Sequence, residues 1–262
     1  MIATDLMEKN NSAGRLLRLF NDTHSKQQNV QARSIWPEVL GLSVSLPEHD
    51  LTAELATMLT PVDDELKQIR VALLSKGIPD GLVSPYVDKA RNAVTATLLT
   101  APWSNVTQYF TADTLLAFQW FAFELNEEIQ AISQEDVAKL LEEMASLEAE
   151  LQTAGLSSGL KEFLLSHLRQ MQTALRQSRI AGTKPLQKAV RTTQHECELE
   201  AEHISAEVQV TNDKTAAKKV IERFITVWKG AVKLAGDTEK LEKGAKAIGG
   251  TVTTLLEYFS KN

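Results

Sequence analysis

The sequence predicts an all-α protein, a multi-helix bundle with a long antiparallel, coiled-coil-like helical hairpin in its C-terminal half. Apolar residues recur at three- and four-residue steps along most of the chain, as they do on the buried face of a helix. Two such stripes follow each other in the middle of the chain, separated by a short glycine-bounded turn. With 43% hydrophobic and 24% charged residues, the composition is typical of a globular protein. We expect about nine or ten helices, divided between residues 1–130 and residues 131–262.

The predicted hairpin spans residues 135–180. Its first helix begins at a capping-box-like sequence, Ser133-Gln-Glu-Asp136, and its second helix follows the turn at residues 155–159. The apolar seam of the two helices comprises Leu140, Met144, Leu147, Leu151, Leu164, Leu168, Met171 and Leu175. Two helices alone cover such a seam incompletely, so a third helix from this chain, a second copy or another protein must cover it.

Elsewhere the helices are defined by their ends and faces. Pro61 suits the first position of a helix that runs to Gly77, and a turn cluster follows at residues 77–85. Residues 114–125 are apolar nearly all round, which predicts a helix surrounded by others. Residues 196–210 fit a helix but also alternate like a short strand, and the sequence leaves that choice open.

The overall charge and the single cysteine exclude several classes of protein. A net charge of −6 argues against a dedicated nucleic-acid binder, and Cys197 alone cannot form an intrachain disulfide. The first residues show no secretory signal, and no run approaches the ~20 apolar residues of a membrane span. We therefore expect a cytoplasmic protein without a transmembrane segment, a cofactor or a small-molecule ligand.

One pair of residues suggests catalysis. Arg18 and His24 are separated by five residues, and this spacing resembles the active-site motif of helical HEPN ribonucleases. The resemblance implies that the pair polarises an RNA phosphate and moves protons. That motif usually has a polar residue directly after the arginine, whereas Leu19 stands here. His24 fits equally well as an ordinary residue near the last carbonyls of a helix.

A metal site has weaker support. Glu200 and His203 have the Glu-x-x-His spacing of dimetal helical bundles, but the second copy that such bundles need is missing from the sequence. We therefore predict no metal. The neighbouring glutamates should raise the pKa of the Cys197 thiol, which makes it a poor nucleophile.

Basic residues are concentrated between residues 161 and 191, where Glu162 is the single acid. A polyanion-binding face there would comprise Arg169, Arg176, Arg179, Lys184 and Lys188. The simpler interpretation is that this basic face packs against an acidic face of the same protein or of a second copy. Nucleic-acid binding is possible on this pattern but not favoured.

These patterns favour a non-catalytic interaction or regulatory protein that binds a protein partner or itself through the 135–180 hairpin. The first alternative is a HEPN-like ribonuclease that acts through Arg18 and His24. The second is an effector that acts at a membrane surface through residues 212–262, which are basic and amphipathic.

Overall fold

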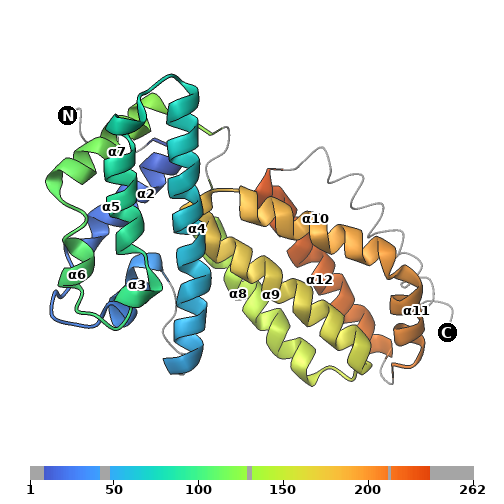
Figure 1. Cartoon of the computed structure of the whole chain (residues 1–262). Coiled ribbons are helices and arrows are strands. Elements are labelled where there is room, and N and C mark those ends of the chain that lie inside the picture. The colour runs from blue at the N-terminus through green and yellow to red at the C-terminus, as the bar shows by residue number, and fades with distance from the viewer. Residues whose placement is uncertain (1–8, 42–47, 129–131, 212–213, 237–262) are drawn as a thin grey trace. The chain divides into compact units, whose positions relative to one another are not determined.

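The protein is all-helical. A computed structural model describes residues 9–41, 48–128, 132–211 and 214–236, and over these residues it contains eleven α-helices and no strand (Figure 1). The chain divides into two compact units. The first unit comprises Met1–Ala131 and Arg179–Gly182, and the second comprises Ile132–Ser178 and Thr183–Asn262.

The first unit is built around an aromatic core. Its helices are α2 (Ser12–Thr23), α3 (Ala32–Leu40), α4 (Glu48–Ser75), α5 (Ser84–Ala93), α6 (Ser104–Thr107) and α7 (Ala112–Glu124). Helix α2 packs against α7 and α4. The rings of Trp36 and Trp103 meet edge to face with centroids 5.1 Å apart, and the ring of Phe20 stacks on that of Phe110 at 4.3 Å. All four side chains are fully buried.

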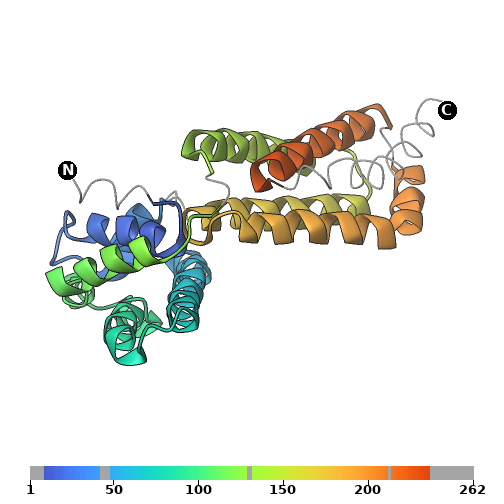
Figure 2. The ribbon, with the colours of Figure 1, turned by 90° about the horizontal axis from the view of Figure 1, so that it is seen from above.

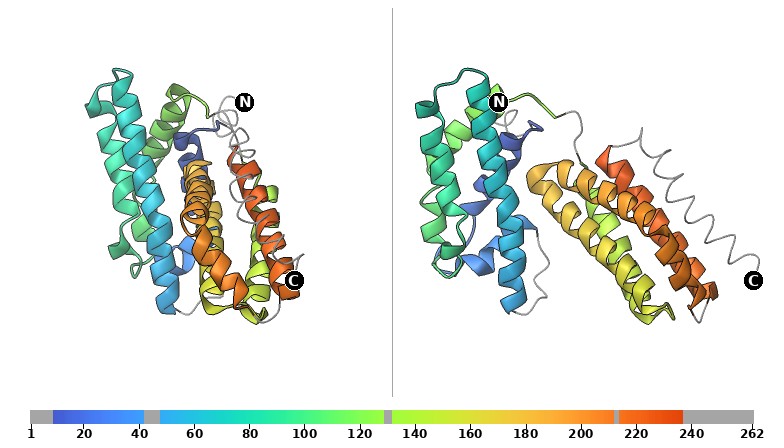
Figure 3. Two further views of the ribbon diagram at one scale, coloured as in Figure 1. Left: turned by 90° about the vertical axis from the view of Figure 1, so that its right-hand side faces the viewer. Right: turned by 45° about the vertical axis from the view of Figure 1, so that its right-hand side comes forward.

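Helix α4 corrects the prediction that Pro61 begins a helix, because Pro61 lies inside it. Figure 3 shows α4 as one continuous helix. An interior proline removes one helical hydrogen bond and costs ~3 kcal/mol. The buried face nevertheless continues across it, from Leu55 and Met58 to Val62 and Leu66. Burying such side chains contributes about 1.5–3 kcal/mol each, which outweighs the cost of the proline.

Helix α7 is also less enclosed than its sequence predicts. Phe118 and Phe121 are fully buried, but Leu116 and Phe123 are each 65% exposed. The prediction of a helix covered on all sides is therefore wrong, because one face of α7 is buried against the described elements of this unit while Leu116 and Phe123 stay exposed.

The described part of the second unit contains five helices. They are α8 (Gln134–Thr153), most of α9 (Ser158–Ala181), α10 (Lys184–Leu199), α11 (Ala201–Gln209) and α12 (Lys214–Ala235). Figure 2 shows α8 beside α12 and α9 beside α10. The predicted cap of α8 is confirmed, since the Ser133 hydroxyl accepts a hydrogen bond from the Asp136 N–H at 3.3 Å. Residues 196–210, ambiguous in sequence, lie in α10, the turn at Glu200, α11 and the residue that follows it.

Gly182 provides a test of the packing within the first unit. Its φ of +64° lies in the left-handed region, and a Cβ atom there would lie 2.7 Å from Glu128 Oε2 and 3.1 Å from Arg15 Nη1. Gly77, with φ of +83°, has open space around its Cβ position. We expect Gly77→Ala to lower the free energy of unfolding by about 1–2 kcal/mol through backbone strain alone. Gly182→Ala should lower it further, as measured by urea denaturation, because the added Cβ also meets the Arg15–Glu128 ion pair. Equal losses for the two variants would show that this ion pair moves aside freely.

Candidate functional site

The predicted hairpin seam is part of the core of the second unit. All eight seam residues are buried, with exposed fractions of 5% or less. Helices α10 and α12 contribute Leu186, Val190, Phe224 and Trp228 to the same core. The helices that cover the seam therefore come from this chain, and the eight side chains present no outward surface to a partner.

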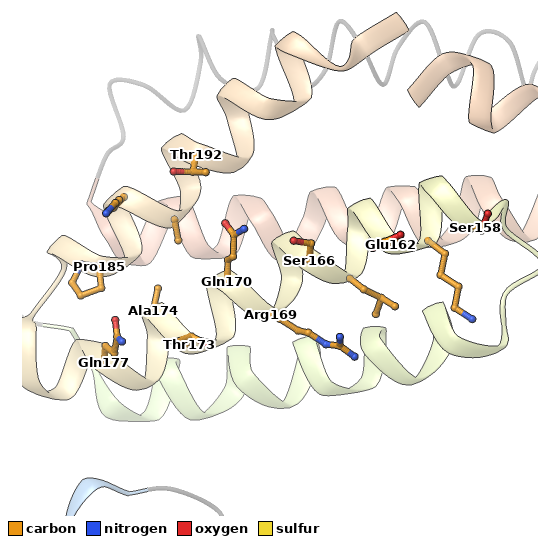
Figure 4. Close-up of a pocket in the computed structure, with 14 residues that line it drawn as sticks. Ser158, Glu162, Ser166, Arg169, Gln170, Thr173, Ala174, Gln177, Pro185 and Thr192 are labelled. Carbon is orange, nitrogen blue, oxygen red and sulfur yellow. The ribbon is translucent and has the colours of Figure 1, made fainter. Parts of the chain in front are cut away.

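The outward surface of α9 and α10 is hollowed instead. A groove of about 830 Å³ lies along these two helices, within the second unit. Figure 4 shows Ser158, Ser166, Gln170 and Gln177 along α9, with Pro185 and Thr192 on α10. The remaining lining residues are Lys161, Glu162, Leu165, Arg169, Thr173, Ala174, Lys188 and Ala189.

The groove combines apolar and cationic side chains. Leu165, Ala174 and Ala189 are buried and give it an apolar floor. Arg169 donates from Nε to Glu148 Oε1 at 2.8 Å, and Lys161 donates from Nζ to the Gln152 carbonyl at 2.7 Å. Both contacts lead back to α8, so they hold the two cationic side chains along the edge of α9.

Two of the five residues of the predicted polyanion-binding face line this groove, namely Arg169 and Lys188. Arg176 and Lys184 are not among the residues that line it. Arg179 belongs to the first unit, where its Nη2 lies 3.3 Å from Asp22 Oδ2. The structure thus brings together part of the predicted face, while Arg179 contacts the exposed carboxylate of Asp22 in the first unit.

Arg18 and His24 do not form a converging pair. Both are exposed, Arg18 within α2 and His24 at its C-terminal cap. Six residues at 100° each turn their side chains about 120° apart on a regular helix. The His24 ring donates from Nε2 to the Phe110 carbonyl at 2.6 Å, and Arg18 Nη1 donates to the Lys9 carbonyl at 3.3 Å. Both side chains therefore contact the backbone of neighbouring segments and not each other.

The metal and thiol candidates also lack the surroundings that their chemistry needs. Glu200 and His203 are exposed, and the described ranges contain no cluster of three or more His, Cys, Asp or Glu side chains placed to hold a metal. Burial raises the pKa of the Cys197 thiol to about 12, and Glu196, Glu198 and Glu200 add to this effect. The predicted direction of that shift is confirmed; that burial is its main cause was not visible in the sequence.

A second hollow, of about 560 Å³, lies in the first unit. Its charged side chains pair with one another: Asp63 is 2.6 Å from both Arg91 Nε and Lys67 Nζ, and Asp64 is 3.2 Å from Lys67 Nζ. The Asp63–Arg91 pair joins α4 to α5, and the two Lys67 pairs lie within α4. Asp88, which also lines the hollow, lies 3.8 Å from Arg91 Nη1.

His167 is a buried histidine that the sequence alone does not single out. The His167 side chain is 1% exposed, with Nε2 3.3 Å from Glu196 Oε2 and Nδ1 3.4 Å from Thr193 Oγ1. Its ring meets that of Phe163 at 4.4 Å. Burial lowers the pKa of His167, against the opposing effect of Glu196 and Glu200. Its place within the α9 stripe could have suggested burial, but its partners on α10 could not be read from the sequence.

We expect the second unit to lose stability as the pH falls below about 6.5, because the unfolded chain then binds a proton that folded His167 resists. Denaturation in urea near pH 7.5 and near pH 5.5 measures this loss. The loss should be smaller in His167→Gln than in the wild type, and unchanged in His195→Gln, since His195 is exposed. The same loss in both variants would assign the effect to other groups.

The apolar face of α12 is covered within the second unit. Val220, Phe224, Val227 and Trp228 are buried, and α12 packs against α8 and α10. Residues 237–262, which complete the proposed membrane-active segment, lie outside the described residues. None of the described helices is both long and apolar enough to span a membrane.

Comparison with known proteins identifies no matching protein family, no matching curated protein and no matching solved structure. The site therefore has to be interpreted from its own residues.

Proposed function

We propose that the protein is a non-catalytic interaction protein that binds a protein partner through the 135–180 hairpin. In this proposal α8 and α9 form the antiparallel, coiled-coil-like hairpin, and the outward face of α9, together with α10, forms the binding surface. The single observation that supports it is the groove of about 830 Å³ along α9 and α10. A second copy of this chain is an alternative occupant, which would give a particle heavier than the 29.0 kDa of one chain.

The groove is favoured over the seam because binding needs an accessible surface. Leu147 and Leu168 are fully buried and would contact a partner only if α10 or α12 moved away. Ser166 and Gln170, by contrast, are exposed and line the groove. An apolar floor with polar edges is typical of protein-binding surfaces.

The ribonuclease and membrane alternatives gain no comparable support. Arg18 lies within α2 and His24 at its C-terminal cap, about 120° apart around a regular helix, and both already contact backbone carbonyls. The described part of the membrane alternative, α12, buries its apolar face in the core.

Site-specific photocrosslinking in cells of the source organism tests the proposal. A photoreactive amino acid at Thr173, in the groove, should give a discrete crosslinked species. The same amino acid at Ala145, an exposed position on α8, should not. Crosslinking of both positions to the same extent, or of neither, would contradict the proposal, and light scattering distinguishes a partner from a second copy.

Filling the groove provides a matched test. Ser166→Trp should reduce the Thr173 crosslink at least about tenfold, because the indole occupies space that the partner needs. Ser166 is exposed, so stability should change by less than about 0.5 kcal/mol, as urea denaturation would verify. Ala145→Trp is the control and should leave the crosslink unchanged; an undiminished crosslink in Ser166→Trp would contradict the role of the groove.

A further inference from the structure

We infer that the groove binds an acidic amphipathic α-helix of the partner protein. This inference rests on the proposed function and adds the chemistry of the partner. It follows from the length of the groove, the nature of its floor and the sign of the charge along its edges.

The length of the groove fits a helix. On α9 its lining extends from Ser158 to Gln177. At 1.5 Å per residue these positions are about 29 Å apart, or roughly five helical turns. On α10 the lining extends from Pro185 to Thr192, so α10 flanks part of this length and α9 lines all of it. This arrangement matches the helix-in-groove mode of recognition, in which one face of the bound helix contacts the groove along several turns.

The floor and the edges fit an amphipathic ligand. Leu165, Ala174 and Ala189 lie at the bottom, and the two alanines leave room for larger apolar side chains from the partner. Ser166, Gln170 and other hydroxyl and amide groups stand beside them. A helix with apolar residues at three- and four-residue steps would bury that stripe against the floor and keep its polar face outside.

The charge favours an acidic helix. Three cations, Lys161, Arg169 and Lys188, line the groove against one acid, Glu162, in a chain whose net charge is −6. Lys188 is exposed and forms no ion pair within the described ranges. Arg169 contacts Glu148 through Nε and keeps other N–H groups for a second carboxylate. Complementary charge at such edges sets orientation and accelerates association.

A nucleic acid fits the groove less well. None of the 14 residues that line it is aromatic, so the groove offers no ring on which bases could stack. An apolar floor has no counterpart in a phosphate backbone, whereas it matches the apolar stripe of a helix.

Fluorescence anisotropy with designed peptides tests the inference on the full chain. The probe is a labelled peptide of about 20 residues with leucines at three- and four-residue steps and glutamates elsewhere. A matched peptide carries lysine at every glutamate position. We expect the acidic peptide to bind at least about tenfold more tightly than the basic one, and more weakly as salt is added.

Charge reversal locates the binding site. Lys188→Glu should weaken the acidic peptide at least about fivefold. Lys139→Glu changes the net charge equally at an exposed position of α8 outside the groove, and should change binding less than about twofold. Circular dichroism melts of both variants verify that the bundle is intact.

Four results would overturn the inference: equal affinity for the two peptides, tighter binding of a single-stranded RNA of similar length, an equal effect of the two charge reversals, or no peptide binding at all. If the Thr173 crosslink forms under any of these results, the interaction function stands and only the chemistry of the partner is wrong. If the crosslink fails while the acidic peptide binds as expected, the preference of the groove for an acidic helix stands and the proposed interaction function fails.

Discussion

Arg15→Met is expected to lower the free energy of unfolding of the first unit by about 3–5 kcal/mol, because it leaves a buried carboxylate without its arginine. The Arg15 and Glu65 side chains are 4% and 3% exposed. Arg15 Nη2 lies 3.1 Å from Glu65 Oε2, and Nη1 lies 2.7 Å from Glu128 Oε2. Arg15 Nε also donates to the Ile180 carbonyl at 2.8 Å. Methionine keeps most of the volume of the side chain and removes all of these contacts.

The control for Arg15→Met is Arg70→Met. Arg70 forms a similar two-pronged contact with Asp80, at 2.8 and 2.7 Å, but both side chains are partly exposed. Its loss should cost less than about 1 kcal/mol, because water replaces the arginine. Hydrogen exchange of α2 and α4 amides assigns each loss to the first unit. If Arg15→Met lowers the free energy of unfolding no more than Arg70→Met does, burial does not increase the contribution of the Arg15 ion pairs to stability.

The sequence could not have predicted the Arg15 cluster. Local spacing places Arg15 on a helix, but its partners Glu65, Glu128 and Ile180 lie 50, 113 and 165 residues further along the chain. Apolar periodicity carries no information about which distant helices meet. Because periodicity does not show which distant segments meet, the sequence also could not predict that Arg179–Gly182 belongs to the first unit.

Helix existence was easier to predict than helix boundaries. The all-helical class follows from apolar spacing, which depends only on neighbours within two turns. The prediction that Pro61 begins a helix was wrong because it considered only the residues next to the proline. The continuity of α4 depends instead on how well the stretches on both sides of Pro61 pack on the core. At α7, apolar composition alone predicts burial all round, and it could not show that Leu116 and Phe123 stay 65% exposed beside the described helices.

The candidate site was predictable only in part. The excess of cations between residues 161 and 191 is visible in the sequence, and Arg169 and Lys188 do line one groove. Their convergence depends on the path of α10 beside α9, and local spacing does not determine it. The sequence predicts an apolar seam that needs covering, and periodicity could not show that its side chains share a buried core with residues of α10 and α12.

Leu168→Ala is expected to lower the free energy of unfolding of the second unit by about 2–5 kcal/mol. Leu168 is fully buried in the core shared by the helices of this unit, so its truncation removes apolar contacts and leaves a cavity. Leu199→Ala is the same substitution at a side chain that is 70% exposed at the end of α10. It should change stability by less than about 0.5 kcal/mol. Urea denaturation of the two variants measures the difference.

This comparison also separates a core role for the seam from a binding role. If the seam is core, Leu168→Ala should lose stability in proportion to its cavity, while under conditions where the variant stays folded the Thr173 crosslink persists. If Leu168 instead contacted the partner directly, truncation would leave stability unchanged and abolish the crosslink. That second outcome would require α10 or α12 to leave the seam when the partner binds, and would move the binding surface from the groove to the interior of the hairpin.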